Sequence, residues 1–405
     1  MKTFLKPLYL RIYPNVTQAT KINSDIGFCR FLWNKMLDER IKVYEEFKDD
    51  KDTLKEHKHK TEKEWKREFE WLKDADSQAL QQTRIDLETA FNNFFKSEKG
   101  EREGEKVGYP KFKSKKGLKQ SFRTCNTNNN IKIDFEKQTI QTPKKGKIKF
   151  RHGDVSECFK DALNIKNITI TRKPSGKYFA SILFEMQKEF TENSNSGLKT
   201  KGLDMHLNKF YVDDEGVSPE YPKPFRKLQR KLKQLQRKHS RKRKGSQNRN
   251  KARLRVARCH EKIANVREDF LHKMSCKLIK ENEQIVVENL AIKNMMKNPK
   301  WAKSVADLGW NSFIQMLIYK ALWNGKRVLM ADRWFASSKL CSVCGWKNNE
   351  LLLSNRTWLC LGCGTLHNRD VNAAKNLKKI GQEVSELTPV EMRVALSLKQ
   401  EAPHL

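Results

Sequence analysis

Two pairs of closely spaced cysteines constrain the fold of this 405-residue chain more than any other feature. The segment CSVCGWKNNELLLSNRTWLCLGCG (residues 341–364) has the pattern C-x2-C, fifteen residues, C-x2-C. Four thiolates satisfy the tetrahedral preference of Zn²⁺, and a glycine after each pair relieves the tight turn that presents both sulfurs. The sequence therefore predicts a closed, structural zinc site made by Cys341, Cys344, Cys360 and Cys363.

His367 follows the second pair and is a fifth candidate ligand. Because four thiolates already complete a tetrahedron, we expect it beside the site or at the surface. The chain has nine cysteines, and in a long chain without an export signal CxxC pairs favour metal binding over disulfides. The other five are expected to be small buried apolar residues: Cys29, Cys125, Cys158, Cys259 and Cys276.

Positive charge is concentrated in one part of the chain. The net charge is +35, and residues 226–258 contain 16 Lys and Arg in 33 positions, with no Asp or Glu. A highly charged surface without a specific partner is the simpler explanation, but the clustering favours binding to a nucleic-acid backbone. The phosphate contacts expected in this run are Arg226, Lys227, Arg230, Lys231, Arg237, Lys238, Arg241, Lys242 and Arg243.

A membrane location is not expected. No apolar run approaches the roughly 20 residues that a membrane-spanning helix needs. The N-terminal stretch MKTFLKPLYLRIYP interrupts its apolar residues with Lys2, Lys6 and Arg11, so it does not resemble a signal peptide. The expectation is a soluble intracellular protein with no membrane partner.

The order of predicted elements divides the chain into parts. A first strand (7–14) precedes a stretch with helical periodicity, and short alternating strands occupy 121–188. After a linker at 190–197, strands alternate with helices, which indicates an α/β layer. The predicted domains are a β domain of 1–14 and 98–190, a helical insert of 15–97, an α/β domain of 191–340 and 364–382, a metal module of 341–363, and a flexible tail of 383–405.

Three carboxylates far apart in the sequence are candidate metal ligands. Asp204 and Glu288 end predicted strands, and Asp370 begins a predicted helix. Burying three carboxylates together is costly unless cations neutralise them, and Mg²⁺ prefers such hard oxygen ligands. The simpler alternative is that each one is a surface residue or a helix cap. Spacing along the chain does not show whether they converge, so both alternatives stay open at this point.

Several motifs, in this order, resemble the TnpB proteins of bacterial and archaeal insertion sequences. They are KGLDMHLNKFYV, IVVENLAIKNM, SSKLCSVCG, RTWLCLGCG and NRDVNAAKN, and weaker matches such as ALQQTRIDLETAFNNFF and GYPKFKSKK extend the likeness to most of the chain. The C-terminal half is the more specific part. Members of this family are RNA-guided DNA endonucleases related to type V CRISPR effectors.

The resemblance implies a fold of α/β, β and α parts. It would contain an RNase H-like RuvC nuclease domain with an inserted zinc ribbon, preceded by a small β-barrel wedge domain that carries a helical recognition insert. Asp204, Glu288 and Asp370 align with the catalytic carboxylates, which would hold Mg²⁺, and the four cysteines align with the zinc ribbon. Gln81, Thr127 and Asn128 lie in matching stretches and are the expected readers of a short motif that flanks the target.

The function that the resemblance implies is RNA-guided cleavage of double-stranded DNA for a mobile element. The guide RNA would derive from the element's end, the protein would be a monomer in a ribonucleoprotein, and cleavage would be a two-metal hydrolysis. One departure stands out: the family has Gly two residues after the first Asp, whereas this chain has His206. An imidazole there adds bulk and one further ligand atom.

Two rival functions remain open. A nuclease-impaired, RNA-guided repressor would be expected to lose a carboxylate, whereas all three are present here and only His206 favours this rival. A strand transferase acting alone would need a nucleophile, and we find no Tyr paired with a metal-binding His-x-His motif. Trp310 and Trp334 are candidates for stacking on single-stranded bases, although packing in the core is the simpler role for each.

Overall fold

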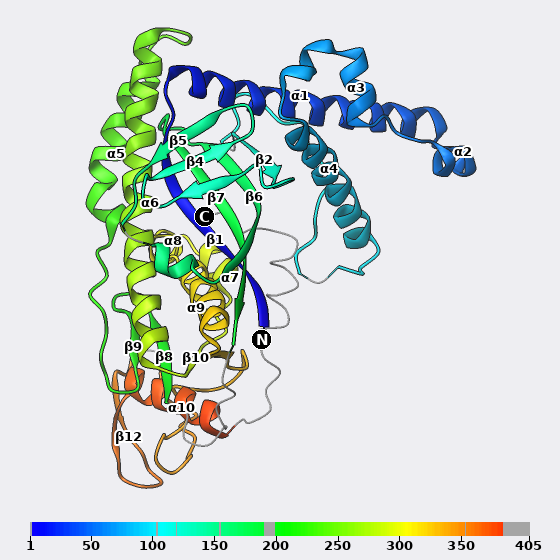
Figure 1. Ribbon diagram of the computed structural model, residues 1–405. Helices are drawn as coiled ribbons and strands as arrows, with labels where there is room; N and C mark the ends of the chain where they lie inside the picture. The colour runs from blue at the N-terminus through cyan, green and yellow to red at the C-terminus, as the bar shows by residue number, and fades with distance from the viewer. Residues whose placement is uncertain are drawn as a thin grey trace. The chain divides into compact units, whose positions relative to one another are not determined.

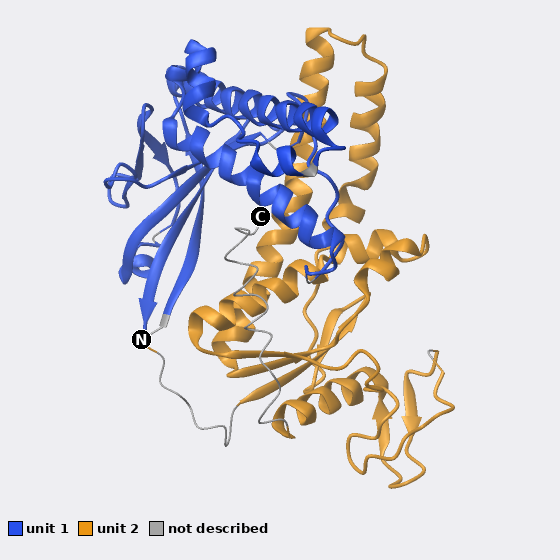
Figure 2. Ribbon diagram, turned by 90° about the vertical axis from the view of Figure 1, so that its right-hand side faces the viewer, with its two compact units in different colours: residues 1–188 blue, residues 189–405 orange. Residues whose placement is uncertain are grey.

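The computed structural model describes residues 2–102, 104–118, 120–153, 155–189, 199–352 and 354–383. The predicted linker at 190–197 and, apart from residue 383, the predicted tail lie outside these ranges. The chain forms two compact units, Met1–Lys188 and Glu189–Leu405, which Figure 2 shows in different colours. No helix among the described residues combines the length and the apolar character that crossing a membrane requires.

The first unit is built on an antiparallel seven-stranded sheet with the order β2-β6-β7-β1-β5-β4-β3 (Figure 1). The first strand of the chain pairs with the last strand of the unit, from Lys2↔Lys188 to Ile12↔Tyr178. The pairings between described strands end at β2 and β3, so closure into a barrel stays a prediction. The strands are β1 (Lys2–Tyr13), β2 (Ser121–Cys125), β3 (Lys132–Asp134), β4 (Thr139–Thr142), β5 (Gly146–Phe150), β6 (Ala162–Arg172) and β7 (Tyr178–Lys188).

Helices lie between β1 and β2. Asn15 caps the first helix, because its side chain accepts a hydrogen bond from the backbone N–H of Gln18 and the Gln18 side chain accepts one from the backbone N–H of Asn15. Asp76 caps the last. Residues 48–60 contain a short helix, capped by Asp50. The helices are α1 (Val16–Phe47), α2 (Lys51–Glu56), α3 (Glu62–Glu68), the 3₁₀ helix η1 (Glu70–Asp74) and α4 (Ser77–Glu98), with η2 (Ser156–Phe159) further along the chain.

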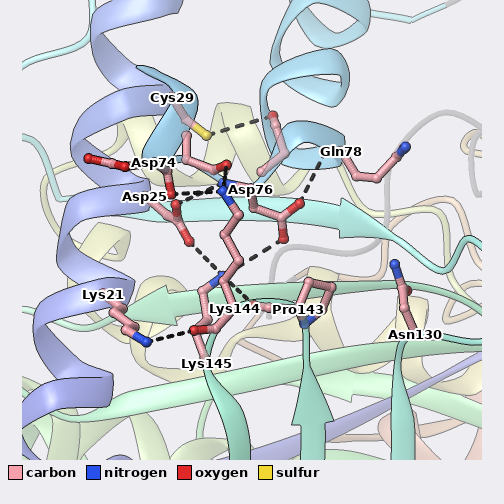
Figure 3. A network of polar contacts seen from close by, with 12 residues as sticks. Lys21, Asp25, Cys29, Asp74, Asp76, Gln78, Asn130, Pro143, Lys144 and Lys145 are labelled. Atoms are coloured by element: carbon pink, nitrogen blue, oxygen red, sulfur yellow. Dashed lines mark hydrogen bonds and ion pairs between the residues drawn. The ribbon is translucent and has the colours of Figure 1, made fainter. Parts of the chain in front are cut away.

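A buried ion-pair network joins this helical insert to the sheet (Figure 3). Lys145, in the turn between β4 and β5, places its Nζ atom 2.6 Å from Oδ2 of Asp25 on α1 and 3.7 Å from Oδ2 of Asp76. All three side chains are almost fully buried. The neighbouring Lys144 donates hydrogen bonds to the last carbonyls of η1 and to that of Ala75. The turn is therefore fixed against the start of α4.

The second unit contains a mixed four-stranded sheet with the order β11-β10-β8-β9. The strands β8, β10 and β11 are parallel, and β9 is antiparallel to β8. Successive β10 side chains pack on opposite faces: Ile285 and Val287 contact a cluster with α6 and α9, whereas Val286 contacts Leu377 of α10. A sheet covered on both faces agrees with the predicted α/β layer. The strands are β8 (Thr200–His206), β9 (Phe210–Asp213), β10 (Gln284–Val287) and β11 (Arg327–Met330).

Helix α10 packs unusually close to the sheet, because glycine occupies two contact positions. A Cβ atom on Gly202 of β8 would lie 2.0 Å from the Ala374 carbonyl oxygen of α10. A Cβ atom on Gly381 of α10 would lie 2.6 Å from the Val286 side chain of β10. The absence of both side chains permits this approach. The helices here are α7 (Ile292–Lys297), α8 (Ala302–Leu308), α9 (Trp310–Asn324) and α10 (Arg369–Glu383).

The basic run forms a helical hairpin, α5 (Pro224–Ser240) and α6 (Gln247–Glu281). Its leucines, Leu228, Leu232 and Leu235, pack in a separate cluster with Cys259 and Ile263 of α6. The leucines thus hold the two helices together, and the charged side chains stay on the outside.

Candidate active site and metal centre

The four cysteines of the two CxxC pairs converge. Their sulfur atoms all lie within 4.8 Å of one another, with 3.6 Å between Cys341 and Cys363 and 3.6 Å between Cys344 and Cys360. A tetrahedron with the usual Zn–S length of ~2.3 Å places its sulfurs about 3.8 Å apart. The residues therefore fit a zinc ion, as the spacing predicts.

The surrounding backbone explains this geometry. The glycines after each pair, Gly345 and Gly364, have φ values of +78° and +69°, which glycine adopts without strain. The second pair lies in the loop of the short hairpin formed by β12 (Thr357–Leu359) and β13 (Leu366–Asn368). His367 is buried with its Nε2 atom 3.0 Å from the Cys341 sulfur, so it lies beside the four sulfurs.

The parallel pairing of β8 with β10 brings two of the three carboxylates to one edge of the sheet. Leu203 pairs with Val287, so Asp204 and Glu288 are the next residues along the two strands. The two side chains are hydrogen-bonded to each other, and Ser337 donates a hydrogen bond of 2.9 Å to Glu288. Asp370, in the first turn of α10, adds the third carboxylate. The structure thus brings together the three residues selected from the sequence.

Burial disfavours the ionised forms of Asp204 and Glu288. Burial raises the pKa of Asp204 well above its ordinary value, and the neighbouring carboxylates of Glu288 and Asp370 raise it further. Burial also raises the pKa of Glu288, although hydrogen bonds from Ser337 and from the backbone of Met205 lower it in part. Bound cations would reverse this by stabilising the negative charges. The donor set therefore fits hard divalent cations such as Mg²⁺.

Asp370 is not the residue that caps its helix. The side chain of Asn368 accepts hydrogen bonds of 3.1 and 3.2 Å from the backbone N–H groups of Asp370 and Val371. This leaves the Asp370 carboxylate outside the cap, 3.5 Å from the Arg356 guanidinium and 3.6 Å from His206 Nε2. The alternative in which Asp370 serves only as a helix cap is therefore disfavoured.

His206 holds the turn between β8 and β9. Its Nδ1 atom accepts hydrogen bonds from the backbone N–H groups of Asn208 and Lys209, at 3.2 and 3.1 Å. Its Nε2 edge faces Asp370. Burial lowers the pKa of His206, so the neutral imidazole is favoured. The bulk that replaces the family's glycine thus lies directly beside the third carboxylate.

The zinc module and α10 are connected by side chains that the sequence did not single out. Asn372 accepts a hydrogen bond from the backbone N–H of Ser342 and donates one to the Leu340 carbonyl. Asn376, one turn later, donates to the carbonyls of Ser337 and Leu340. The helical spacing of the two asparagines in NRDVNAAKN was the available signal, but their partners lie 30 to 39 residues away in the sequence.

The predicted nucleic-acid contacts lie in both units. Gln81 is half-buried on α4, and Thr127 and Asn128 are exposed in the turn after β2. On the α5–α6 hairpin a cavity of about 440 Å³ is lined by five cationic side chains, Lys238, Arg241 and Lys242 of the predicted set with Lys251 and Arg255. All nine predicted basic residues of the run are exposed.

Four other expectations can be decided. Trp310 is buried and its Nε1–H donates to the Phe210 carbonyl at 3.0 Å, so it does not stack on bases. Trp334, by contrast, is 86% exposed, so the core role expected for it is wrong. Cys158 and Cys276 are exposed, which corrects the prediction that the scattered cysteines are buried.

Sequence reasoning also missed a second group of metal-ligand side chains, Glu39, His57 and His59, whose ligand atoms lie within 4.8 Å of one another. The signal was the His-x-His pair in EHKHK, residues 56–60. The carboxylate it meets is 18 residues away from His57 on another helix, so spacing alone did not identify the group.

Three family models match parts of the chain. Residues 181–299 match a model described as "Probable transposase", and residues 310–377 match "Cas12f1-like, TNB domain". Residues 1–49 match a "Helix-turn-helix domain". In the structure this last segment is strand β1 followed by the single helix α1, so its secondary structure differs from that description.

Relatives with similar sequences cover nearly the whole chain. A protein of Streptomyces pristinaespiralis named "Putative RNA-guided DNA endonuclease" is 33% identical, over 93% of this chain and 89% of its own. "Putative RNA-guided DNA endonuclease InsQ" of Escherichia coli K12 is 31% identical, over 94% and 93%. A solved "Cas12f1-sgRNA-target DNA complex" contains a chain with 14% identity and a TM-score of 0.48, covering 93% of this chain and 99% of that chain. On the strength of the two sequence relatives, this chain belongs to the TnpB family of insertion-sequence proteins.

Proposed function

We propose that this protein is an RNA-guided DNA endonuclease of a mobile element. The observation that carries the proposal is the convergence of Asp204, Glu288 and Asp370 at one edge of a mixed sheet. It occurs in a chain that is 33% identical, over almost its full length, to a relative with that name. A guide RNA from the element's end would select the target by base pairing, and the protein would recognise a short flanking motif in double-stranded DNA.

The three carboxylates would hold Mg²⁺. Their ligand atoms do not all lie within 4.8 Å of one another, unlike the four cysteine sulfurs. This wider spacing suits two ions better than one. When bound, the ions would activate a water molecule and stabilise the leaving oxygen of a phosphodiester. The chain's own part is to fix the carboxylates: β8 and β10 hold Asp204 and Glu288, Ser337 orients Glu288, and α10 presents Asp370.

The other parts support guided binding. We propose that the mixed sheet is an RNase H-like RuvC domain and that the cysteine module is a zinc ribbon within it. The first unit would provide the wedge and recognition parts, with Gln81, Thr127 and Asn128 reading the flanking motif. The exposed cations of α5 and α6 would bind guide RNA or heteroduplex phosphates. One chain would act per RNA, at the nucleoid.

Plasmid cleavage tests the proposal. The protein, co-expressed with the RNA from its own 3′ flank, is incubated with a plasmid that carries the matching target and with Mg²⁺. Asp204→Asn should lower guided cleavage by about a thousandfold or more, because losing a metal ligand removes several kcal/mol of transition-state stabilisation. The matched control Glu220→Gln changes an exposed carboxylate of the same unit and should cut like the wild type.

Each rival function predicts a different result. Target binding that depends on the guide, with no cleavage by the wild-type protein, would identify an RNA-guided repressor and overturn the enzyme proposal. Strand joining by the purified protein without RNA would support a transposase, the description attached to the model that matches residues 181–299. Equal cleavage by Asp204→Asn and the wild type would place the chemistry elsewhere.

A further inference from the structure

A second candidate metal site lies in the helical insert of the first unit, outside the machinery of the proposed function. Glu39 is on α1, His57 follows the last residue of α2, and His59 lies in the connection to α3 (Figure 1). One ligand atom of each lies within 4.8 Å of the others. We propose that these three side chains bind a divalent transition-metal ion, with zinc as the first choice, and that the ion fixes the α2–α3 connection to α1.

The local backbone explains why the two histidines share a side. Helix α2 ends at Glu56, and His57 has an extended conformation (φ −62°, ψ 122°). In extended backbone, alternate residues point to the same side. Accordingly His57 and His59 are both half-buried, whereas Lys58 between them is exposed. The backbone N–H of Lys60 donates a hydrogen bond of 3.2 Å to Glu39 Oε1, which holds this segment against α1.

Two polar atoms of the group are buried and lack a hydrogen-bond partner. They are Oε2 of Glu39 and Nδ1 of His59. A buried polar atom that is left without a partner destabilises the folded state. A water molecule would satisfy each one separately, whereas one cation between them satisfies both and uses His57 as well. The two atoms without a partner therefore point to a bound cation, independently of how close the three side chains lie.

The positive charge of the neighbouring Arg40 acts on this group. Arg40 opposes a further cation, but its guanidinium lies over the Phe91 ring, 4.7 Å from the centroid. The carboxylates of Glu39 and Glu88 offset its charge.

The ligand set determines the class of ion. Two imidazole nitrogens and one carboxylate oxygen suit zinc and other late first-row ions, whereas Mg²⁺ and Ca²⁺ prefer oxygen ligands only. Three protein ligands leave one tetrahedral position for water or for another group. The site therefore differs in chemistry from both the four-cysteine module and the carboxylate triad of the second unit.

Metal counting on the full-length protein tests the inference. Protein loaded with Co²⁺ in a competing chelator buffer, then desalted, is analysed for cobalt by mass spectrometry. The wild type should carry about two ions per chain. The double variant His57→Asn, His59→Asn should lose one of them. Thiolate-to-cobalt absorption bands, which only the cysteine site gives, should be unchanged and show that the second unit remains folded.

A matched control and a second readout exclude trivial explanations. His152→Asn removes an exposed histidine of the same unit and should leave the count at the wild-type value. Zinc should slow amide hydrogen exchange in residues 51–60 of the wild type and have no effect there in the double variant. One ion per chain in the wild type, or an unchanged count in the double variant, would overturn the proposal. Equal exchange with and without zinc would overturn the role in fixing the connection.

Discussion

Asp370 and the cysteines that precede it belong to different groups of side chains, although only six residues lie between Cys363 and Asp370. The four sulfurs converge on one another, whereas the Asp370 carboxylate faces His206 and raises the pKa of Asp204. Asn368 lies between them and caps α10. A short segment thus leaves the four-sulfur group and joins the carboxylate group, with a neutral side chain at the boundary.

This separation predicts the behaviour of Asp370→Asn. The variant should bind zinc like the wild type, because its side chain lies outside the four sulfurs. It should lose guided cleavage by about a thousandfold or more, since a neutral amide replaces a metal-binding carboxylate. Zinc content and plasmid cutting are measured on the same preparation. Normal cutting with normal zinc would remove Asp370 from the proposed active site.

Lys145 provides a second prediction at the scale of single residues. Its replacement by alanine leaves the buried carboxylates of Asp25 and Asp76 without their cation. Breaking a buried ion pair in this way costs about 3–5 kcal/mol. Amide hydrogen exchange should therefore accelerate in α1 and β5, whereas Lys149→Ala, an exposed lysine on the same strand, should change it little. Unchanged exchange in Lys145→Ala would mean that the network does not stabilise the unit.

At the scale of elements, the distance between α10 and the sheet decides where the third carboxylate lies. Gly202→Ala would place a methyl group against the backbone of α10, where an ideal Cβ is 2.0 Å from the Ala374 oxygen. Overpacking of this kind costs about 1–3 kcal/mol or more. We expect a lower melting temperature and little guided cleavage, because the helix that presents Asp370 is displaced. In the control Gly108→Ala, where the added Cβ has nothing within 4 Å, both should match the wild type.

Periodicity was sufficient to predict most helices and strands, because it reports which side of an element is buried. The helix that contains Trp33 and the strand that ends before Glu288 are examples. Convergence was not predictable in this way. Asp204 and Glu288 meet because β8 and β10 pair in parallel, and that register depends on contacts between segments separated by 83 residues of chain. The family resemblance, not the spacing, identified the triad.

Periodicity also does not predict where single side chains lie in the folded chain. Nothing in the residue type distinguishes Trp310, which packs under the sheet, from Trp334, which is exposed. The leucines of α5 gave a correct amphipathic pattern, but the pattern does not say which partner covers the apolar side. That partner is the next helix, α6. Likewise, EHKHK contains a His-x-His pair, but only the fold brings Glu39 to it.

At the scale of the whole molecule, the charge of the α5–α6 hairpin predicts how binding responds to salt. Replacing Lys238, Arg241 and Lys242 by alanine removes three cations that line one cavity. The slope of log K against log salt concentration for the guide RNA should fall by about two to three units, since each phosphate contact contributes about 0.7 to 0.9. Affinity is measured over a salt series by filter binding or fluorescence anisotropy.

The control removes the same charge elsewhere. Lys48, Lys55 and Lys63 are exposed in the helical insert, and their triple replacement by alanine changes the net charge equally. If both triple variants shift the slope by the same amount, the effect comes from overall charge and the hairpin has no special role. A change confined to the hairpin variant would locate the phosphate contacts on it.

The pairing of the first strand with the last strand of its unit affects how the protein is made. Ile12 finds its partner Tyr178 only after 166 further residues (178 − 12) have been synthesised. At about 5–20 residues per second, a ribosome needs roughly ten to thirty seconds for that stretch. During this time the apolar strand FLKPLYLRIY lacks β7, the neighbour that pairs with it from Lys2 to Ile12. Strand β1 is therefore made long before it is fully paired, and a chaperone contact during synthesis would fall on it.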